Sequence, residues 1–173
     1  MPKPTLSISL TLSALLLACA TLAPLAQAAP NVVYVTRHAE KTGADKDPAL
    51  TAQGAARARM LAALLHRADI RYVFSSDTRR TRQTAQPLAE RVKLNVEVYD
   101  AARPAPAIER IKALGGPTLL VGHSNTVPDL VRMLGGAPVA PIGDDEYDRL
   151  YQVSIHDNGT VSTVLLSSSA SAP

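Results

Sequence analysis

Short apolar runs alternate with longer amphipathic stretches along this chain, a pattern typical of strands that alternate with helices. The apolar runs predict strands at 31–36, 72–74, 96–98 and 118–121. The amphipathic stretches predict helices at 51–68, 78–91, 105–114 and 127–134. Two further alternating runs, at 150–155 and 161–166, are joined through Asp157-Asn158-Gly159, and Asn-Gly between such runs is a strong hairpin signal.

This order of elements predicts an α/β fold. Strands that alternate with helices form a mostly parallel sheet, because each crossover helix brings the chain back to the end of the sheet where the previous strand began. The next strand therefore runs in the same direction. We therefore expect a three-layer sandwich, with a mostly parallel central sheet flanked by helices and a late antiparallel hairpin. In such folds the active site lies at the carboxyl ends of the strands.

The first 28 residues have the three parts of a secretory signal peptide. Lys3 precedes an apolar run at 6–23, and Ala26-Gln27-Ala28 is a small-x-small cleavage site. We expect cleavage after Ala28, one folded domain at 29–166 and a disordered Ser/Ala-rich tail at 167–173. A membrane anchor is the alternative, but the run is near the lower length limit for a span and ends close to a proline.

The expected location is the periplasm or the medium, with no membrane span after processing. The sequence contains a single cysteine, Cys19, so cleavage after Ala28 leaves a domain without thiols, which suits an oxidising compartment. Leu16-Leu17-Ala18-Cys19 loosely resembles a lipobox, and a lipoprotein anchored at Cys19 is the competing form of export.

Composition and charge exclude several classes of protein. The sequence has 18 Lys+Arg and 15 Asp+Glu, a formal net charge of +3, no Trp and one Phe. The basic residues form no long run and few aromatic rings are available for stacking on bases, so we expect no nucleic-acid partner. A single cysteine also excludes a disulfide scaffold and a cysteine-based zinc module.

Three of the predicted strands end in residues that suit an anion. The first runs into Arg37-His38, the second into a serine pair followed by Arg79, Arg80 and Arg82, and the fourth into Gly122-His123-Ser124. If the strands are parallel, these segments meet at one rim. Guanidinium groups keep their charge and match phosphate oxygens bidentately, so this rim predicts a phosphate site.

A metal site on His38 and His123 is the competing chemical hypothesis. It lacks a third convincing ligand and any H-x-x-x-H spacing, so we expect no metal and no other cofactor. Arg79 and Arg82 are expected on the outer surface of their helix. Arg57, Arg59 and Arg67 are expected on the solvated face of the preceding helix.

Four motifs together resemble the histidine phosphatase superfamily, also called phosphoglycerate mutase-like. The motifs occur in the family's order within about residues 32–134, and the four together are a more specific signal than any single motif. They are Arg37-His38-Ala39-Glu40, Leu50-Thr51-Ala52-Gln53-Gly54, the segment from Ser75-Ser76 through Arg80 to Gln83-Thr84-Ala85, and Val121-Gly122-His123-Ser124.

The resemblance implies a mechanism. His38 is expected to be the nucleophile that forms a phosphohistidine, with Arg37, Arg80 and His123 as the other catalytic residues around the phosphoryl group. The expected secondary substrate contacts are Ser124, Asn125 and Lys41. The family's general acid follows the third strand, where only Asp100 is available, and its position after Arg80 is early for that role.

These features predict a metal-independent phosphatase for phosphate monoesters. The substrate is expected to be a phosphorylated small molecule, a phosphosugar of the cell envelope or a phosphoprotein. Two alternatives remain open: a non-catalytic module that binds phosphate, and a mutase that transfers the phosphoryl group between two positions of one substrate.

Overall fold

The structure is a computed structural model, and it describes residues 30–43 and 45–168. The predicted signal peptide, Cys19 and residues 169–173 of the predicted tail lie outside the described residues. Within the described part, no helix has the length and apolar character needed to cross a membrane.

A single mixed sheet forms the middle layer, in the strand order β3-β2-β4-β1-β5-β6. The first four strands of that order are mutually parallel, whereas β5 runs antiparallel to both β1 and β6. The strands are β1 (Asn31–Arg37), β2 (Tyr72–Ser76), β3 (Val96–Tyr99), β4 (Thr118–Gly122), β5 (Arg149–Ile155) and β6 (Val161–Ser167).

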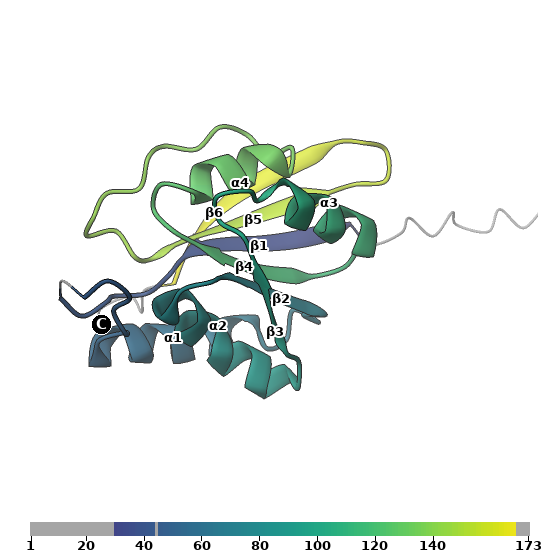
Figure 1. Ribbon diagram of the computed structural model, residues 1–173. Helices are drawn as coiled ribbons and strands as arrows, with labels where there is room; N and C mark the ends of the chain where they lie inside the picture. Colours follow the sequence, from purple (N-terminus) through teal and green to yellow (C-terminus); the bar gives the residue numbers. More distant parts are fainter. Residues whose placement is uncertain (1–29, 44, 169–173) are drawn as a thin grey trace, which may run out of the picture.

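The helices form the two outer layers. Figure 1 shows α1 and α2 on one face of the sheet and α3 and α4 on the other. Two separate clusters of buried side chains match these layers, because one contains residues of α1 and α2 and the other contains residues of α3 and α4. The helices are α1 (Ala52–Leu65), α2 (Arg79–Val92), α3 (Ala105–Leu114) and α4 (Val127–Met133).

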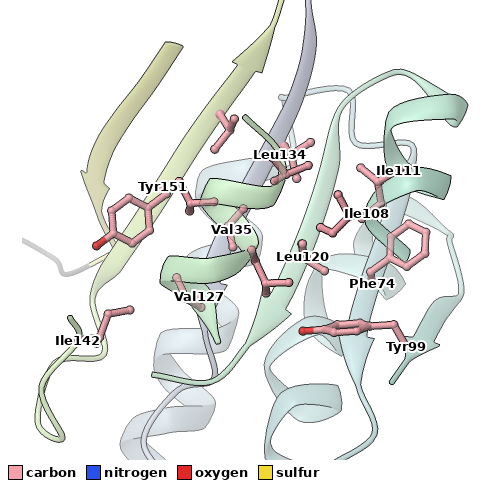
Figure 2. Packing of buried hydrophobic residues seen from close by; sticks show 14 residues of the cluster. Val35, Phe74, Tyr99, Ile108, Ile111, Leu120, Val127, Leu134, Ile142 and Tyr151 are labelled. Carbon is pink, nitrogen blue, oxygen red and sulfur yellow. The ribbon is translucent and has the colours of Figure 1, made fainter. Parts of the chain in front are cut away.

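The core on the α3/α4 side packs the strands that end at the rim. Val35 of β1 and Leu120 of β4 lie against Val127 and Leu134 of the α4 region, as Figure 2 shows. All four side chains are 1 % exposed or less. Removal of this apolar surface from water is the main force that holds the strands in register, so the rim rests on a rigid base.

The L-T-x-x-G motif proves to be a local packing device. Thr51 is the N-cap of α1, where its hydroxyl accepts a hydrogen bond from the Gly54 amide at 3.0 Å. A Cβ on Gly54 would lie 2.2 Å from the carbonyl oxygen of Glu40, so only glycine admits this close approach. The motif therefore fixes the chain directly after His38 against α1.

The predicted fold class is confirmed, with six strands and four helices among the described residues. Most element boundaries differ from the prediction by one or two residues, and two of the differences change the description of the fold. Helix α1 ends at Leu65 instead of 68, and Asp69 follows with a positive φ of 49°. Strand β6 extends to Ser167, and the amide of the buried Ser168 donates to the Asp148 carbonyl at 2.7 Å. The first two residues of the predicted tail are therefore part of the folded domain.

Candidate active site

The parallel strands bring the predicted site residues together at one rim. Arg37 is the last residue of β1, Ser76 the last of β2, and His123 directly follows β4. Because β2, β4 and β1 are neighbours in the sheet, residues separated by 85 positions in the sequence become adjacent. The ring centroids of His38 and His123 lie 5.5 Å apart.

His38 is held in the tautomer that a nucleophile needs. Its side chain is buried, its amide donates to the Gly122 carbonyl at 3.0 Å, and its ring Nδ1 lies 2.8 Å from the Ala39 carbonyl oxygen. A carbonyl oxygen only accepts hydrogen bonds, so Nδ1 carries the proton. The neutral ring therefore has its lone pair on Nε2.

His123 is oriented by groups from two other segments. Its Nε2 donates to the Ser76 hydroxyl at 2.8 Å, and that hydroxyl in turn donates to Thr81 at 3.1 Å. Arg80 Nη2 lies 3.3 Å from Nδ1 of the same ring. Since a guanidinium only donates, Nδ1 accepts, and this arrangement requires a neutral His123.

Both histidines stay neutral at pH values well below the ordinary histidine pKa of 6.5. Burial lowers the pKa of His38 to about 4, and the charges of Arg37, Arg80 and His123 act in the same direction, although the bond to Ala39 opposes them. Burial and the same two guanidinium groups lower the pKa of His123 to about 4 as well. The rim therefore presents two fixed positive charges beside two uncharged rings.

Arg37 is anchored by the backbone of a distant loop. Its Nη1 donates to the carbonyl oxygens of Gly143, Asp144 and Glu146, at 2.8, 2.9 and 3.1 Å. The ring of Tyr147 lies against the same guanidinium, with its centroid 4.1 Å from Cζ, and is 6.1 Å from the His38 ring. The segment between α4 and β5 thus forms part of the site.

Arg80, in contrast, is surrounded by side chains. Its Nη2 contacts His123, and its Nη1 lies 3.8 Å from the carboxylate of Asp47. Asp47 also accepts the amide of Arg79 at 2.9 Å, and so caps the N-terminus of α2, where the side chain of Thr78 makes no such bond.

Each of the two arginines leaves one buried donor without a partner. The Nε atoms of Arg37 and Arg80 are buried and have no hydrogen-bond partner within the described part of the chain. A buried unsatisfied N–H is costly, and a cationic one more so. A phosphate oxygen is the kind of acceptor that satisfies such donors.

Arg57 corrects one sequence-based expectation. It is not on a solvated face, because its side chain is only 17 % exposed and binds the Glu40 carboxylate through both Nε and Nη2, at 2.6–3.0 Å. The sequence pattern of α1 gave no sign of an acidic partner outside the helix. Glu40 thereby ties the chain after His38 to α1 and is not a free carboxylate. We call the group of side chains that meets at the rim the phosphate cluster; it consists of Arg37, His38, Arg80 and His123.

The remaining predicted residues lie in the turn after His123, in the loop after β1 and beside a cavity next to His123. Ser124 and the exposed Asn125 form the turn after His123, and the exposed Lys41 pairs with Leu50 across the base of a loop. Asp100 lines a cavity of about 390 Å³ whose wall includes His123. However, Arg103 and the Ala102 amide bind the Asp100 carboxylate and hold its pKa below the usual value.

Sequence reasoning missed Tyr147 and Asp47. Both lie in irregular segments whose partners are far away in the sequence, so no periodic pattern marks them. The only available signal was their position in polar loops that flank the predicted strand ends. No group of three potential metal ligands occurs among residues 30–43 and 45–168.

The sequence comparison agrees with the motifs. Residues 33–104 match the model of the histidine phosphatase superfamily (branch 1), which includes the first three motifs. The predicted resemblance to this superfamily is thereby confirmed. No curated protein matches the chain.

Solved structures of phosphatases have the same fold. Protein histidine phosphatase SixA complexed with tungstate matches with a TM-score of 0.64 and 20% identity, over 79% of this chain and 97% of that one. Mycobacterial glucosyl-3-phosphoglycerate phosphatase with inorganic phosphate matches with a TM-score of 0.65 and 20% identity, over 82% and 100%. A putative alpha-ribazole-5'-P phosphatase from Escherichia coli matches with a TM-score of 0.57 and 16% identity, over 80% and 95%.

Proposed function

We propose that this chain, which resembles the histidine phosphatase superfamily in motifs and fold, is a phosphatase that hydrolyses phosphate monoesters through a phosphohistidine on His38. One observation carries the proposal: a neutral imidazole with a free Nε2 lies beside two guanidinium groups that each bury an unsatisfied donor. The solved phosphatases of the same fold, among them one that acts as a protein histidine phosphatase, support this chemistry.

The first step transfers the phosphoryl group to the enzyme. The lone pair of His38 Nε2 attacks phosphorus, the N–P bond forms, and the bond between phosphorus and the ester oxygen breaks. The ester oxygen keeps the electron pair and leaves as an oxyanion, which takes a proton from solvent. Arg37 and Arg80 stabilise the charge on the equatorial oxygens, and this is the main contribution that a protein makes to phosphoryl transfer. In the second step water attacks phosphorus, the N–P bond breaks with its electron pair returning to Nε2, and a proton passes to solvent. Inorganic phosphate is released and neutral His38 is restored.

The environment of Asp100 favours substrates with good leaving groups. Its carboxylate is exposed and bound by Arg103, so its ionised form is stabilised and it is a weak proton donor. An aryl, acyl or imidazole leaving group needs no proton from the enzyme. We therefore expect 4-nitrophenyl phosphate to be hydrolysed much faster than an alkyl ester such as glycerol 3-phosphate.

The direct test is release of inorganic phosphate from 4-nitrophenyl phosphate in excess EDTA. We expect turnover that resists EDTA and is lost in His38→Ala, with His156→Ala as a matched control because that histidine is exposed beside the hairpin turn. Phosphate that moves within one substrate without release would establish a mutase. Phosphate binding by a folded protein without turnover would establish a binding module.

We also propose that the chain is exported and processed after Ala28, as the composition of residues 1–28 indicates. Cell fractionation and N-terminal sequencing of the protein test this. A soluble periplasmic form that begins at Ala29 is expected, and Cys19→Ser should leave it unchanged. A membrane-bound form that Cys19→Ser releases would establish the lipoprotein instead.

A further inference from the structure

Two neighbouring cavities lie along the edge strand β3, and the nearer one is bordered by His123 of the phosphate cluster. The cavity of about 390 Å³ beside His123 shares Val98, Tyr99 and Asp100 with a second cavity of about 480 Å³, which extends over α3 to Arg110. We call the two together the β3 groove. Strand β3 is the last strand on its side of the sheet, so the groove is open to solvent along that edge.

The charges around the β3 groove cancel in pairs. Asp77 pairs with Arg82 at the end near the cluster. Further along, Asp100 pairs with Arg103 at 2.9 Å and Glu97 with Arg110 at 3.0 Å. No free cation is therefore offered to an anionic group in this part of the described chain, in contrast to the two guanidinium groups of the phosphate cluster.

The floor of the groove is apolar and exposed. Val98 is 52 % exposed although it lies in the middle of a strand, and Ala101, Ala102, Pro106 and Ala107 line the same surface. A half-exposed valine gains free energy when a ligand covers it, because apolar surface leaves water. This floor suits the flat apolar face of a ring.

We infer that the β3 groove binds the leaving group of the substrate, and that it selects an uncharged aryl ring. The inference rests on the proposed function, because the phosphoryl group must lie between His38, Arg80 and His123 for the rest of the substrate to enter the groove. His123 is the residue that the phosphate cluster and the nearer cavity have in common, and its ring centroid lies 5.5 Å from that of His38.

A pair of matched variants tests the position of the subsite. Val98→Gln places a larger neutral side chain in the groove without changing the charge near the phosphate. Val164→Gln is the control, because Val164 is a similarly exposed valine on β6, the opposite edge strand. Acetyl phosphate, whose leaving group has no ring, reports the phosphate chemistry with much less contact to the groove.

For Val98→Gln we expect the KM for 4-nitrophenyl phosphate to rise about fivefold, as loss of one half-covered apolar side chain implies. The kcat/KM for acetyl phosphate should change less than about twofold, and Val164→Gln should match the wild type on both substrates. Equal KM values for Val98→Gln and wild type would overturn the inference. Wild-type protein that hydrolyses neither substrate would instead overturn the proposed function.

A second comparison tests the charge preference. The substrates 4-nitrophenyl phosphate and 4-carboxyphenyl phosphate have similar shapes, but only the second has a charged group at the far end of the ring. We expect a KM at least about threefold higher for the carboxylate, because the groove offers no unpaired cation to offset its loss of hydration. A lower KM for 4-carboxyphenyl phosphate would overturn the inferred selectivity.

Pro106→Gln provides an independent variant at the far end of the groove, in the exposed first turn of α3. It should raise the KM only for substrates longer than one ring, such as 4-nitrophenyl phosphate extended by a second phenyl group. The same increase for 4-nitrophenyl phosphate itself would place the leaving group further along the groove than we infer.

Discussion

The two arginines of the site are held in different ways, although both face the same histidines. The Nη1 of Arg37 donates to three backbone carbonyls of the segment before β5. Arg80 is contacted by the side chains of His123 and Asp47. Arg37 is buried, whereas Arg80 is only partly buried.

The two arginine side chains should therefore respond differently to mutation, pH and salt. Backbone carbonyls around Arg37 stay in place when single side chains are replaced, so its orientation depends on the fold of the loop. The orientation of Arg80 depends on one imidazole and one carboxylate, which respond to mutation, pH and salt. We therefore expect Arg37 to contribute to both stability and catalysis, and Arg80 mainly to catalysis.

The largest expected effect comes from Lys replacements of the two arginines. In Arg37→Lys one ammonium group cannot replace both the three bonds of Nη1 and the donor at Nε, so kcat/KM for 4-nitrophenyl phosphate should fall about 1000-fold and the Tm should also fall. Arg80→Lys should lower kcat/KM about 100-fold with little change in Tm. Equal losses of Tm in the two variants would contradict the distinction.

The pH dependence of stability tests the two histidines. Their native pKa values of about 4 lie below the ordinary value of 6.5. Above pH 6.5 the ring is neutral in both states, and as pH falls towards 4 the unfolded chain binds protons that the native state does not. The free energy of unfolding should therefore decrease by up to about 1.4 kcal/mol per pH unit for each histidine in this window.

His123→Asn supplies the control for that measurement. The variant lacks one of the two groups that bind a proton only in the unfolded chain in this range of pH. The unfolding free energy should therefore decrease less steeply between pH 6.5 and 4, by the contribution of one proton. Urea titrations at half-unit intervals of pH measure both slopes. An unchanged slope in the variant would contradict the lowered pKa of His123.

Replacing Tyr147 tests whether the Arg37 guanidinium also depends on a side-chain contact for its part in catalysis. Tyr147→Leu removes the ring that lies against the guanidinium, and kcat/KM should fall about tenfold, as loss of a partly buried cation–π contact implies. Tyr147→Phe keeps the ring and should stay within about twofold of wild type. A large loss in Tyr147→Phe would instead assign a role to the hydroxyl.

The smallest expected effect is that of Asp47 on the Arg80 region. Asp47→Asn keeps an acceptor for the Arg79 amide but removes a negative charge 3.8 Å from Arg80. The inhibition constant for inorganic phosphate should therefore fall about two- to threefold at low ionic strength, and the difference should disappear at about 1 M salt. If phosphate inhibits the variant more weakly than the wild type, the main effect of Asp47 is to position Arg80, and its competition with phosphate for the guanidinium is the smaller effect.

Local patterns in the sequence were sufficient for the fold. The β-branched runs marked every strand of the sheet, and Thr51, Gly115 and the Asn158-Gly159 turn marked a helix start, a helix end and the hairpin, because each acts on its immediate neighbours. Order at Ser167 and Ser168 was not predictable from their Ser-rich surroundings, because it depends on bonds to the distant Asp148.

The site was only partly predictable. Arg37, His38, Arg80 and His123 stand next to strand ends, so their convergence followed from the parallel order of strands. Contacts made across the sequence gave no local signal: the three carbonyls that bind Arg37 lie more than 100 residues after it, and the partner of Arg57 lies outside its helix. These long-range contacts orient the arginine side chains, and local sequence patterns do not predict such contacts.

The phosphohistidine on His38 is the central claim, and trapping it is the most direct test. Protein mixed with excess 4-nitrophenyl phosphate is quenched within milliseconds in alkali, where phosphohistidine survives, and its peptides are analysed by mass spectrometry. The account predicts phosphate on the peptide that contains His38, in the wild type and in His156→Ala but not in His38→Ala. Phosphate on His123 or on any other residue during turnover would contradict it.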